Sequence, residues 1–200
     1  MKTDVIVVSS KGHRMEKALA EVDKIAAYKG LSPKNVLHLR LLTEEMMGMM
    51  RSITGETEGR FWIEDDAGTY ELHLQVETRM NSDKREQLLS AATSGKNEAA
   101  KGLMGRLRDF FDRSADEDVA GMCSPLLLTG ADEYSGSSLD WEWSMIRYEE
   151  ALSESIKNED EEAREAWDEL EKSVVSHVAD DIRVYIRGVR VEMTIIKKLA

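Results

Sequence analysis

The stretch Thr69–Glu77, read Thr-Tyr-Glu-Leu-His-Leu-Gln-Val-Glu, alternates apolar and polar side chains along its length. On a strand, the apolar residues would share one face and the polar residues the other, which is typical of an antiparallel sheet with one buried face. Residues 60–64 form a second strand-like run, and the turn-rich tetrapeptide Asp65-Asp66-Ala67-Gly68 joins the two runs. The sequence therefore predicts a β-hairpin with one face in a core.

Further strands are expected at both ends of the chain. Residues 5–8, Val-Ile-Val-Val, form a short β-branched run near the N-terminus. Near the C-terminus, residues 183–186 and 189–196 flank Arg187-Gly188, and the second of these runs alternates apolar and polar side chains. This pattern predicts a second hairpin in the same sheet.

Helical spacing of apolar residues predicts three longer helices and one short one, over residues 10–30, 33–53, 98–111 and 85–92. The start of the second helix is the sharpest, because Ser32 can cap it and Pro33 occupies the first helical position. Helices covering one face of a mostly antiparallel sheet form a two-layer sandwich of the α+β type. We expect this α/β architecture, plus an acidic helical insert.

The insert is indicated by an uneven charge distribution. Between Trp141 and Asp181 there are fourteen acidic and four basic residues, whereas the rest of the chain is close to balanced. Two helices are expected there, over residues 141–156 and 159–177, with acidic outer faces. Acidic side chains three and four residues apart on a helix repel one another, so these helices need apolar side chains that dock them onto each other or onto the sheet. The candidates are Trp141, Trp143, Leu152, Trp167 and Leu170.

Composition excludes several classes of function. The net charge of −12 argues against nucleic-acid binding, because phosphates would be repelled. No run of about eighteen apolar residues occurs, so no membrane span is expected. The single cysteine, Cys123, forms no internal disulfide, and the four histidines lack the spacing of metal ligands. We therefore expect a cytoplasmic protein without a bound metal.

Three stretches carry a resemblance to a known family, and they lie over residues 39–47, 70–77 and 190–199. The first, Leu-Arg-Leu-Leu-Thr-Glu-Glu-Met-Met, resembles the helix that bears the N-box of the histidine-kinase-like ATPases, the GHKL superfamily. The others resemble its strand leading to the aspartate-glycine box and its last strand. The chain looks most similar to bacterial anti-sigma-factor serine kinases. The resemblance implies an ATPase-type domain over residues 1–112 and 180–200, and a loop and acidic helical insert over 113–179.

The resemblance also implies positions for a nucleotide site. Glu45 matches the catalytic acid, Glu77 stands where an aspartate contacts adenine, and Gly102 is a candidate for the phosphate loop. Two positions depart from the family pattern. Met49 replaces an asparagine that holds magnesium and has no oxygen to offer the ion, while Arg79 replaces a glycine. A surface glutamate paired with a cation is the alternative interpretation of Glu45.

We therefore expect a regulatory, partner-binding protein that resembles an anti-sigma factor, with a decayed ATP site and no cofactor. Its partner by resemblance is a sigma factor or an antagonist protein. One alternative is a divergent serine kinase that still binds Mg-ATP through Glu45, Glu77 and Gly102. Another is an interaction module whose acidic helices engage a basic partner.

Overall fold

The computed structural model describes residues 1–9, 13–54, 58–77, 140–187 and 190–199. Its centre is a six-stranded sheet in which every neighbouring pair is antiparallel. In spatial order, the strands are β1 (Ile6–Ser9), β2 (Glu58–Asp66), β3 (Thr69–Glu77), β6 (Arg190–Lys198), β5 (Asp181–Arg187) and β4 (Asp140–Ser144). The expected pairing of both hairpins in one sheet is confirmed.

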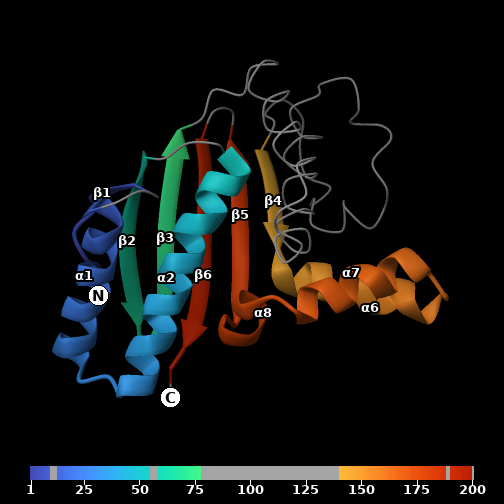
Figure 1. Cartoon of the computed structure of the whole chain (residues 1–200), viewed down its shortest axis with the longest axis horizontal. Helices are drawn as coiled ribbons and strands as arrows, with labels where there is room; N and C mark the ends of the chain where they lie inside the picture. Colours follow the sequence, from blue (N-terminus) through green and yellow to red (C-terminus); the bar gives the residue numbers. More distant parts are fainter. Residues whose placement is uncertain (10–12, 55–57, 78–139, 188–189, 200) are drawn as a thin grey trace.

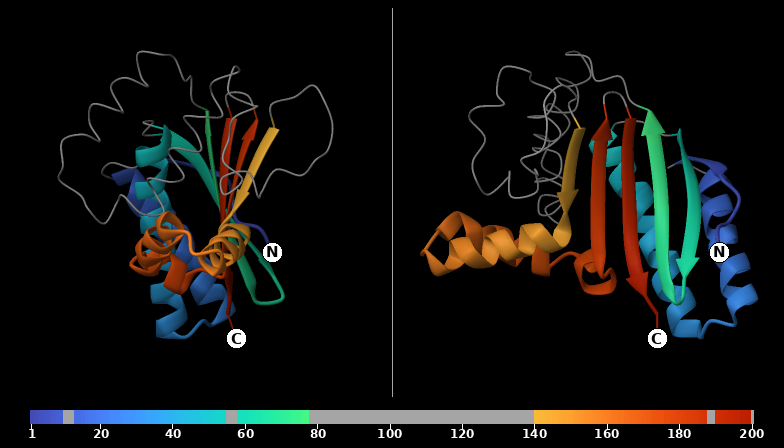
Figure 2. Two further views of the ribbon diagram at one scale, coloured as in Figure 1. Left: turned by 90° about the vertical axis from the view of Figure 1, so that its right-hand side faces the viewer. Right: turned by 180° about the vertical axis from the view of Figure 1, so that it is seen from behind.

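Two long helices cover one face of this sheet. Helix α1 (His13–Lys29) lies over β1 and β2, and helix α2 (Pro33–Thr54) runs diagonally across β3 and β6 (Figure 1). Together with the sheet they enclose the core, whose largest fully buried side chains include Leu39, Leu42 and Phe61. No described helix covers the other face (Figure 2). The two-layer α+β sandwich is therefore confirmed, while the helices expected over 85–92 and 98–111 lie outside the described residues.

The turn between β2 and β3 is shorter than the sequence suggests. Asp65 and Asp66 pair with Tyr70 and Thr69, so only Ala67 and Gly68 form the loop, with φ angles of 49° and 92°. Positive φ at both positions is the geometry of the tight turns that match strand twist. Aspartate is depleted in strands, and for this reason the sequence predicts that Asp65 and Asp66 belong to the turn.

Trp141, Glu142 and Trp143 form part of an edge strand, which corrects the expected helix over 141–156. In β4, Trp143 pairs with Val184 of β5, and helix α6 (Met145–Lys157) begins only after the strand ends. The side chains alternate between the two faces of the sheet, as in a strand and not as in the expected helix. Trp143 is buried beside Val184, while Glu142 lies on the opposite face. The sheet thus includes residues 140–144, which the sequence had placed in the insert.

The helix expected over 159–177 is two helices, α7 (Glu161–Glu171) and α8 (Val174–Val178). Ser173 between them is extended, at φ −76° and ψ 125°, and Ser176 Oγ donates to the Leu170 and Ser173 carbonyls. A hydroxyl that satisfies freed carbonyls in this way stabilises a break in the helix.

The expected apolar anchoring is confirmed for Trp143, Leu152 and Leu170, which are all buried. Trp167 packs on the core partly exposed, and the side chain of Trp141 lies outside the described residues. Helices α6 and α7, here called the acidic arm, extend away from the sheet beyond β4 (Figure 1). Among the described residues, no helix is both long and apolar enough to cross a bilayer.

Candidate functional site

The position of a nucleotide site in the resembled family falls on the second half of α2. Met49 is 3% exposed there and belongs to the core cluster together with Met46 and Met50. Its thioether therefore contributes to packing between the helix and the sheet. Glu45, one turn earlier, is half-buried at the solvent border of the same helix.

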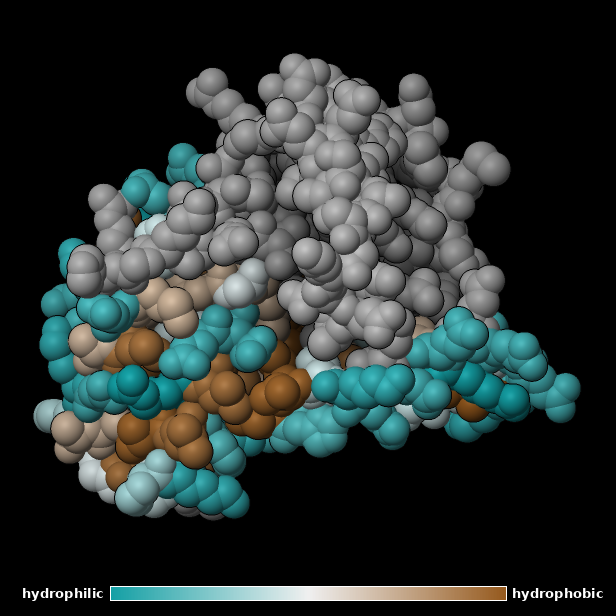
Figure 3. Space-filling model, in the orientation of Figure 1, coloured by the Kyte–Doolittle hydropathy of each residue, from teal (hydrophilic) through white to brown (hydrophobic). Residues whose placement is uncertain are grey.

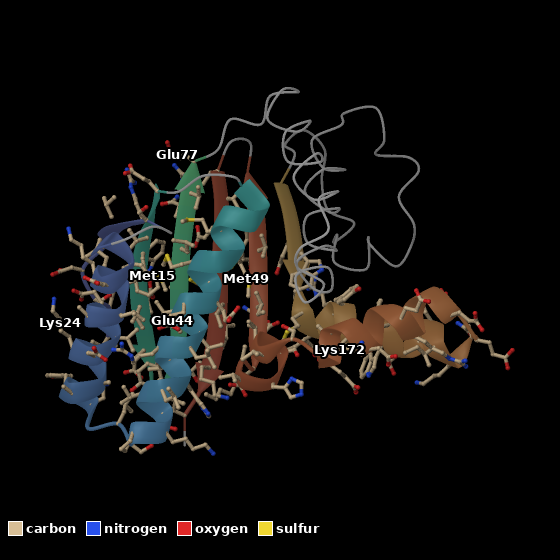
Figure 4. All side chains as sticks on the ribbon, viewed as in Figure 1. Met15, Lys24, Glu44, Met49, Glu77 and Lys172 are labelled. Atoms are coloured by element: carbon tan, nitrogen blue, oxygen red, sulfur yellow. The ribbon has the colours of Figure 1, made fainter. Side chains whose placement is uncertain are left out.

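Glu77 lies on the other side of the sheet from α2. It is the last residue of β3 and is exposed, in phase with Gln75, whereas Val76 between them is buried in the core. Figure 4 shows Glu77 at the end of β3 and Met49 on the helix that crosses the opposite face. Glu45 and Glu77 are therefore not brought together, and Gly102 lies outside the described residues.

Glu77 borders a shallow hollow of about 260 Å³ at the end of β1, β2 and β3. Its lining combines two carboxylates with one guanidinium and is formed by Val7, Glu58, Gly59, Arg60, Gln75 and Glu77. Gly59 is required here, because a Cβ on it would lie 2.9 Å from the Gln75 carbonyl oxygen and 3.2 Å from Met50 Sδ. The close approach of β2 to β3 and α2 therefore depends on the missing side chain.

The uncovered sheet face carries a built cluster that the sequence did not single out. Trp62, His73 and Thr194 occupy matching positions on β2, β3 and β6. The Trp62 and His73 rings stack with centroids 4.8 Å apart and planes 5° from parallel, and the Lys2 ammonium lies 4.9 Å from the Trp62 ring centroid. Thr194 Oγ1 hydrogen-bonds His73 Nδ1 at 3.1 Å. One sequence feature indicates this cluster, which is that His73 falls on the polar face of the alternating stretch Thr69–Glu77.

Three glutamates surround the His73 ring. Its Nε2 lies 3.3 Å from Glu71 and 4.0 Å from Glu64, and its Nδ1 lies 3.8 Å from Glu192. Burial lowers the pKa of His73 below its ordinary value, and this outweighs the three carboxylates, which act in the opposite direction. The buried Nε2 of the ring makes no hydrogen bond among the described residues.

The cluster does not form a metal centre. Across the described parts of the chain, no group of three or more histidine, cysteine or acidic side chains is arranged to hold a metal ion. Glu64 is also engaged elsewhere, because Oε1 accepts hydrogen bonds from Lys2 Nζ and Trp62 Nε1, each at 2.9 Å. These bonds lower the pKa of Glu64 and fix its carboxylate beside the ring stack.

The acidic arm is the third distinctive region. Leu152, Ala163, Ala166 and Leu170 of the arm are all buried, while Ile146 at its start is 42% exposed. Its outer surface carries exposed carboxylates, which are Glu150, Glu154, Glu161, Glu165 and Asp168. The arm therefore presents several carboxylates to solvent over a buried apolar layer.

Comparison with known proteins adds no relative from which a role could be transferred. No family model, no curated protein and no solved structure matches the chain.

Proposed function

We propose that this chain is a regulatory, partner-binding protein of the anti-sigma-factor kind, with a histidine-kinase-like ATPase fold whose nucleotide site has been lost. The partner would be a sigma factor or an antagonist protein in a bacterial cytoplasm. The single observation that carries the proposal is the burial of Met49, because the resembled family uses an oxygen-bearing side chain there.

The chemistry of magnesium explains why this observation matters. Mg²⁺ requires hard oxygen ligands in near-octahedral geometry and binds ATP through its phosphates and one or two protein oxygens. Met49 offers none, and the neighbouring Met46 and Met50 fill the same region of the core. The exposed Glu77 lies across the sheet from these residues, so it offers no adenine contact on the α2 side. Without a magnesium ligand at position 49 and an adenine contact from Glu77, the free energy of Mg-ATP binding would be small.

Calorimetric titration with Mg-ATP tests this proposal. We expect no saturable binding tighter than about 1 mM, which corresponds to about −4 kcal/mol. Titrations with ADP and without magnesium are the controls. Micromolar Mg-ATP binding, about −8 kcal/mol, would contradict the proposal and favour the serine kinase, and Glu77→Ala should then weaken binding more than Glu45→Ala.

The exposed carboxylates of the acidic arm favour a second candidate function, an interaction module for a basic partner. Glu161, Glu165 and Asp168 are exposed on α7. A surface of one sign accelerates the encounter with an oppositely charged partner, and salt screens this effect. The other interpretation of the arm is a solvated cover for the apolar residues beneath it.

Charge reversal separates the two interpretations of the arm. Replacing Glu161, Glu165 and Asp168 with lysine is expected to leave thermal stability nearly unchanged and to lower affinity for a lysine-rich peptide by about tenfold or more at low salt. The matched control replaces the exposed Asp4, Glu44 and Asp66 with lysine, which changes the net charge equally. Equal losses in both variants would show that net charge alone acts and that the arm is a solvated surface.

A further inference from the structure

The two faces of the sheet differ in the side chains that lie on them. On the helical face, hydrophobic residues gather beside the mostly hydrophilic acidic arm (Figure 3). On the opposite face, mostly polar side chains occupy the matching positions of β2, β3 and β6. Two of these side chains are buried, with His73 at 9% exposure and Thr194 at 6%. The proposed function gives no role to this buried imidazole, although histidine is the side chain that most readily changes charge near neutral pH.

The charged side chains that face His73 come from its own strand, from the strands on either side and from the N-terminal residues. Among the described residues these are Glu71, Glu64, Glu192 and Lys2, with the exposed Arg60 and Arg183 farther out on β2 and β5. The three carboxylates favour a positive charge on the ring, whereas the Lys2 ammonium opposes one.

Lys2 and His73 share two partners. Glu64 Oε1 accepts a hydrogen bond from Lys2 Nζ at 2.9 Å, and the same oxygen lies 4.0 Å from His73 Nε2. The Trp62 ring stacks on the imidazole with centroids 4.8 Å apart, and its centroid lies 4.9 Å from the Lys2 ammonium. When His73 gains a proton, two cations therefore compete for one carboxylate oxygen and one aromatic ring.

Lys2 belongs to a short segment that is attached along β2. The Thr3 N–H donates to the Ile63 carbonyl at 2.9 Å. The Asp65 N–H donates to the Met1 carbonyl at 2.7 Å. The side chain of Lys2 reinforces these backbone bonds, so a cation that competes with it weakens the attachment of the segment.

We propose that His73 is a proton-sensitive switch: when its ring gains a proton, the Lys2 side chain leaves Glu64, and residues 1–3 loosen from β2. Burial lowers the pKa of His73 below its ordinary value of 6.5, so the unfolded chain binds this proton more tightly than the folded chain. The folded state therefore loses stability as the pH falls below 6.5. This inference goes beyond the proposed partner-binding function and does not depend on it.

Nuclear magnetic resonance of the full chain tests the switch, in a titration from about pH 8 to about pH 5, where ordinary carboxyl groups remain mostly ionised. The His73 ring resonances report the proton, and backbone nitrogen relaxation of residues 2 and 3 reports the attachment of the segment. We expect these residues to gain mobility over the same pH range in which His73 gains its proton. His73→Gln stays uncharged and should hold the segment in place throughout the titration.

A reciprocal test leaves the buried ring intact. If the proton displaces Lys2, removing the Lys2 charge must strengthen proton binding, because coupling between two sites is equal in both directions. Lys2→Met should therefore raise the pKa of His73, with a gain of about twofold or more in proton affinity. Lys34→Met removes an exposed lysine of α2 and changes the net charge equally. This control should leave the His73 titration unchanged.

Three kinds of result would overturn the switch. The first is a His73 ring that gains no proton above about pH 5. The others are equal changes in segment mobility in the parent and in His73→Gln, or equal His73 titrations in Lys2→Met and Lys34→Met. If His73→Gln does not fold, the titration of Lys2→Met decides alone. The Mg-ATP titration does not involve His73, so failure of the switch and failure of the proposed function are distinguishable.

Discussion

Asp181→Ala is expected to lower the free energy of unfolding by about 3 kcal/mol, because this carboxylate is buried and satisfies several donors at once. Asp181 is 3% exposed at the start of β5. It accepts hydrogen bonds from Ser144 Oγ at 3.2 Å, from the backbone N–H groups of Ile146 at 3.4 Å and Ile182 at 2.9 Å, and from Arg183 Nε at 2.8 Å. Alanine would remove the acceptor that these donors share, and only Arg183, whose side chain is 44% exposed, could readily bond water instead.

The location of Asp181 makes the expected loss local to the acidic arm. Ser144 occupies the N-cap position of α6 but makes no side-chain capping bond of its own. Asp181 instead reaches across from β5 to the first turn of that helix, where a negative charge is favourable. The variant should therefore loosen the arm before the rest of the sheet.

Urea unfolding followed by circular dichroism measures the loss. Asp181→Asn keeps one acceptor oxygen and should cost less than alanine, while Asp168→Ala, at an exposed position of the arm, should stay within about 0.5 kcal/mol of the parent. A loss below about 1 kcal/mol for Asp181→Ala would mean that water replaces the carboxylate without penalty.

Gly59→Val is expected to cost about 2–3 kcal/mol, since it places atoms where the fold has no space. Even a single Cβ at this position would lie 2.9 Å from a backbone carbonyl oxygen and 3.1 Å from Leu74 Cδ1. The backbone cannot withdraw as a flexible side-chain end would, so β2 must shift away from β3. Thermal unfolding of the variant measures the effect.

Gly48→Ala is the matched control, because the chain offers a second glycine with the opposite surroundings. Gly48 lies on the exposed side of α2, and a Cβ there would meet nothing within 4 Å. Alanine should therefore stabilise the helix by up to about 1 kcal/mol. Similar melting temperatures for Gly59→Val and the parent would contradict the packing argument at β2.

The hairpins and the two long helices were predictable, because their signals are local. Thr69–Glu77 alternates so regularly that its buried face follows from the sequence alone, and Pro33 fixes the start of α2. The edge strand β4 was not predictable in the same way. Residues 140–144 directly precede helix α6, and only pairing with β5 decides where the strand ends.

The candidate site was less accessible to sequence reasoning than the fold. The family positions suggested Glu45 and Glu77 as two acids of one site. The structure places them on opposite sides of the sheet, because the alternation along β3 turns Glu77 away from the face that α2 covers. The cluster around His73 depends on register, since Trp62 and Thr194 reach it from strands on either side. Thr194 is 121 positions away along the chain, so no local pattern could bring it to His73.

The central pairing of β3 with β6 has a consequence for folding kinetics. Strand β1 pairs with β2 across 49–55 positions of the sequence, whereas β6 pairs with β3 across 113–129 positions. Closing a loop costs entropy that rises only with the logarithm of its length, about 0.6 kcal/mol for each doubling. We therefore expect the pairing of β6 with β3 to form later than the local hairpins, and its entropic cost changes little with the length of chain between the two strands.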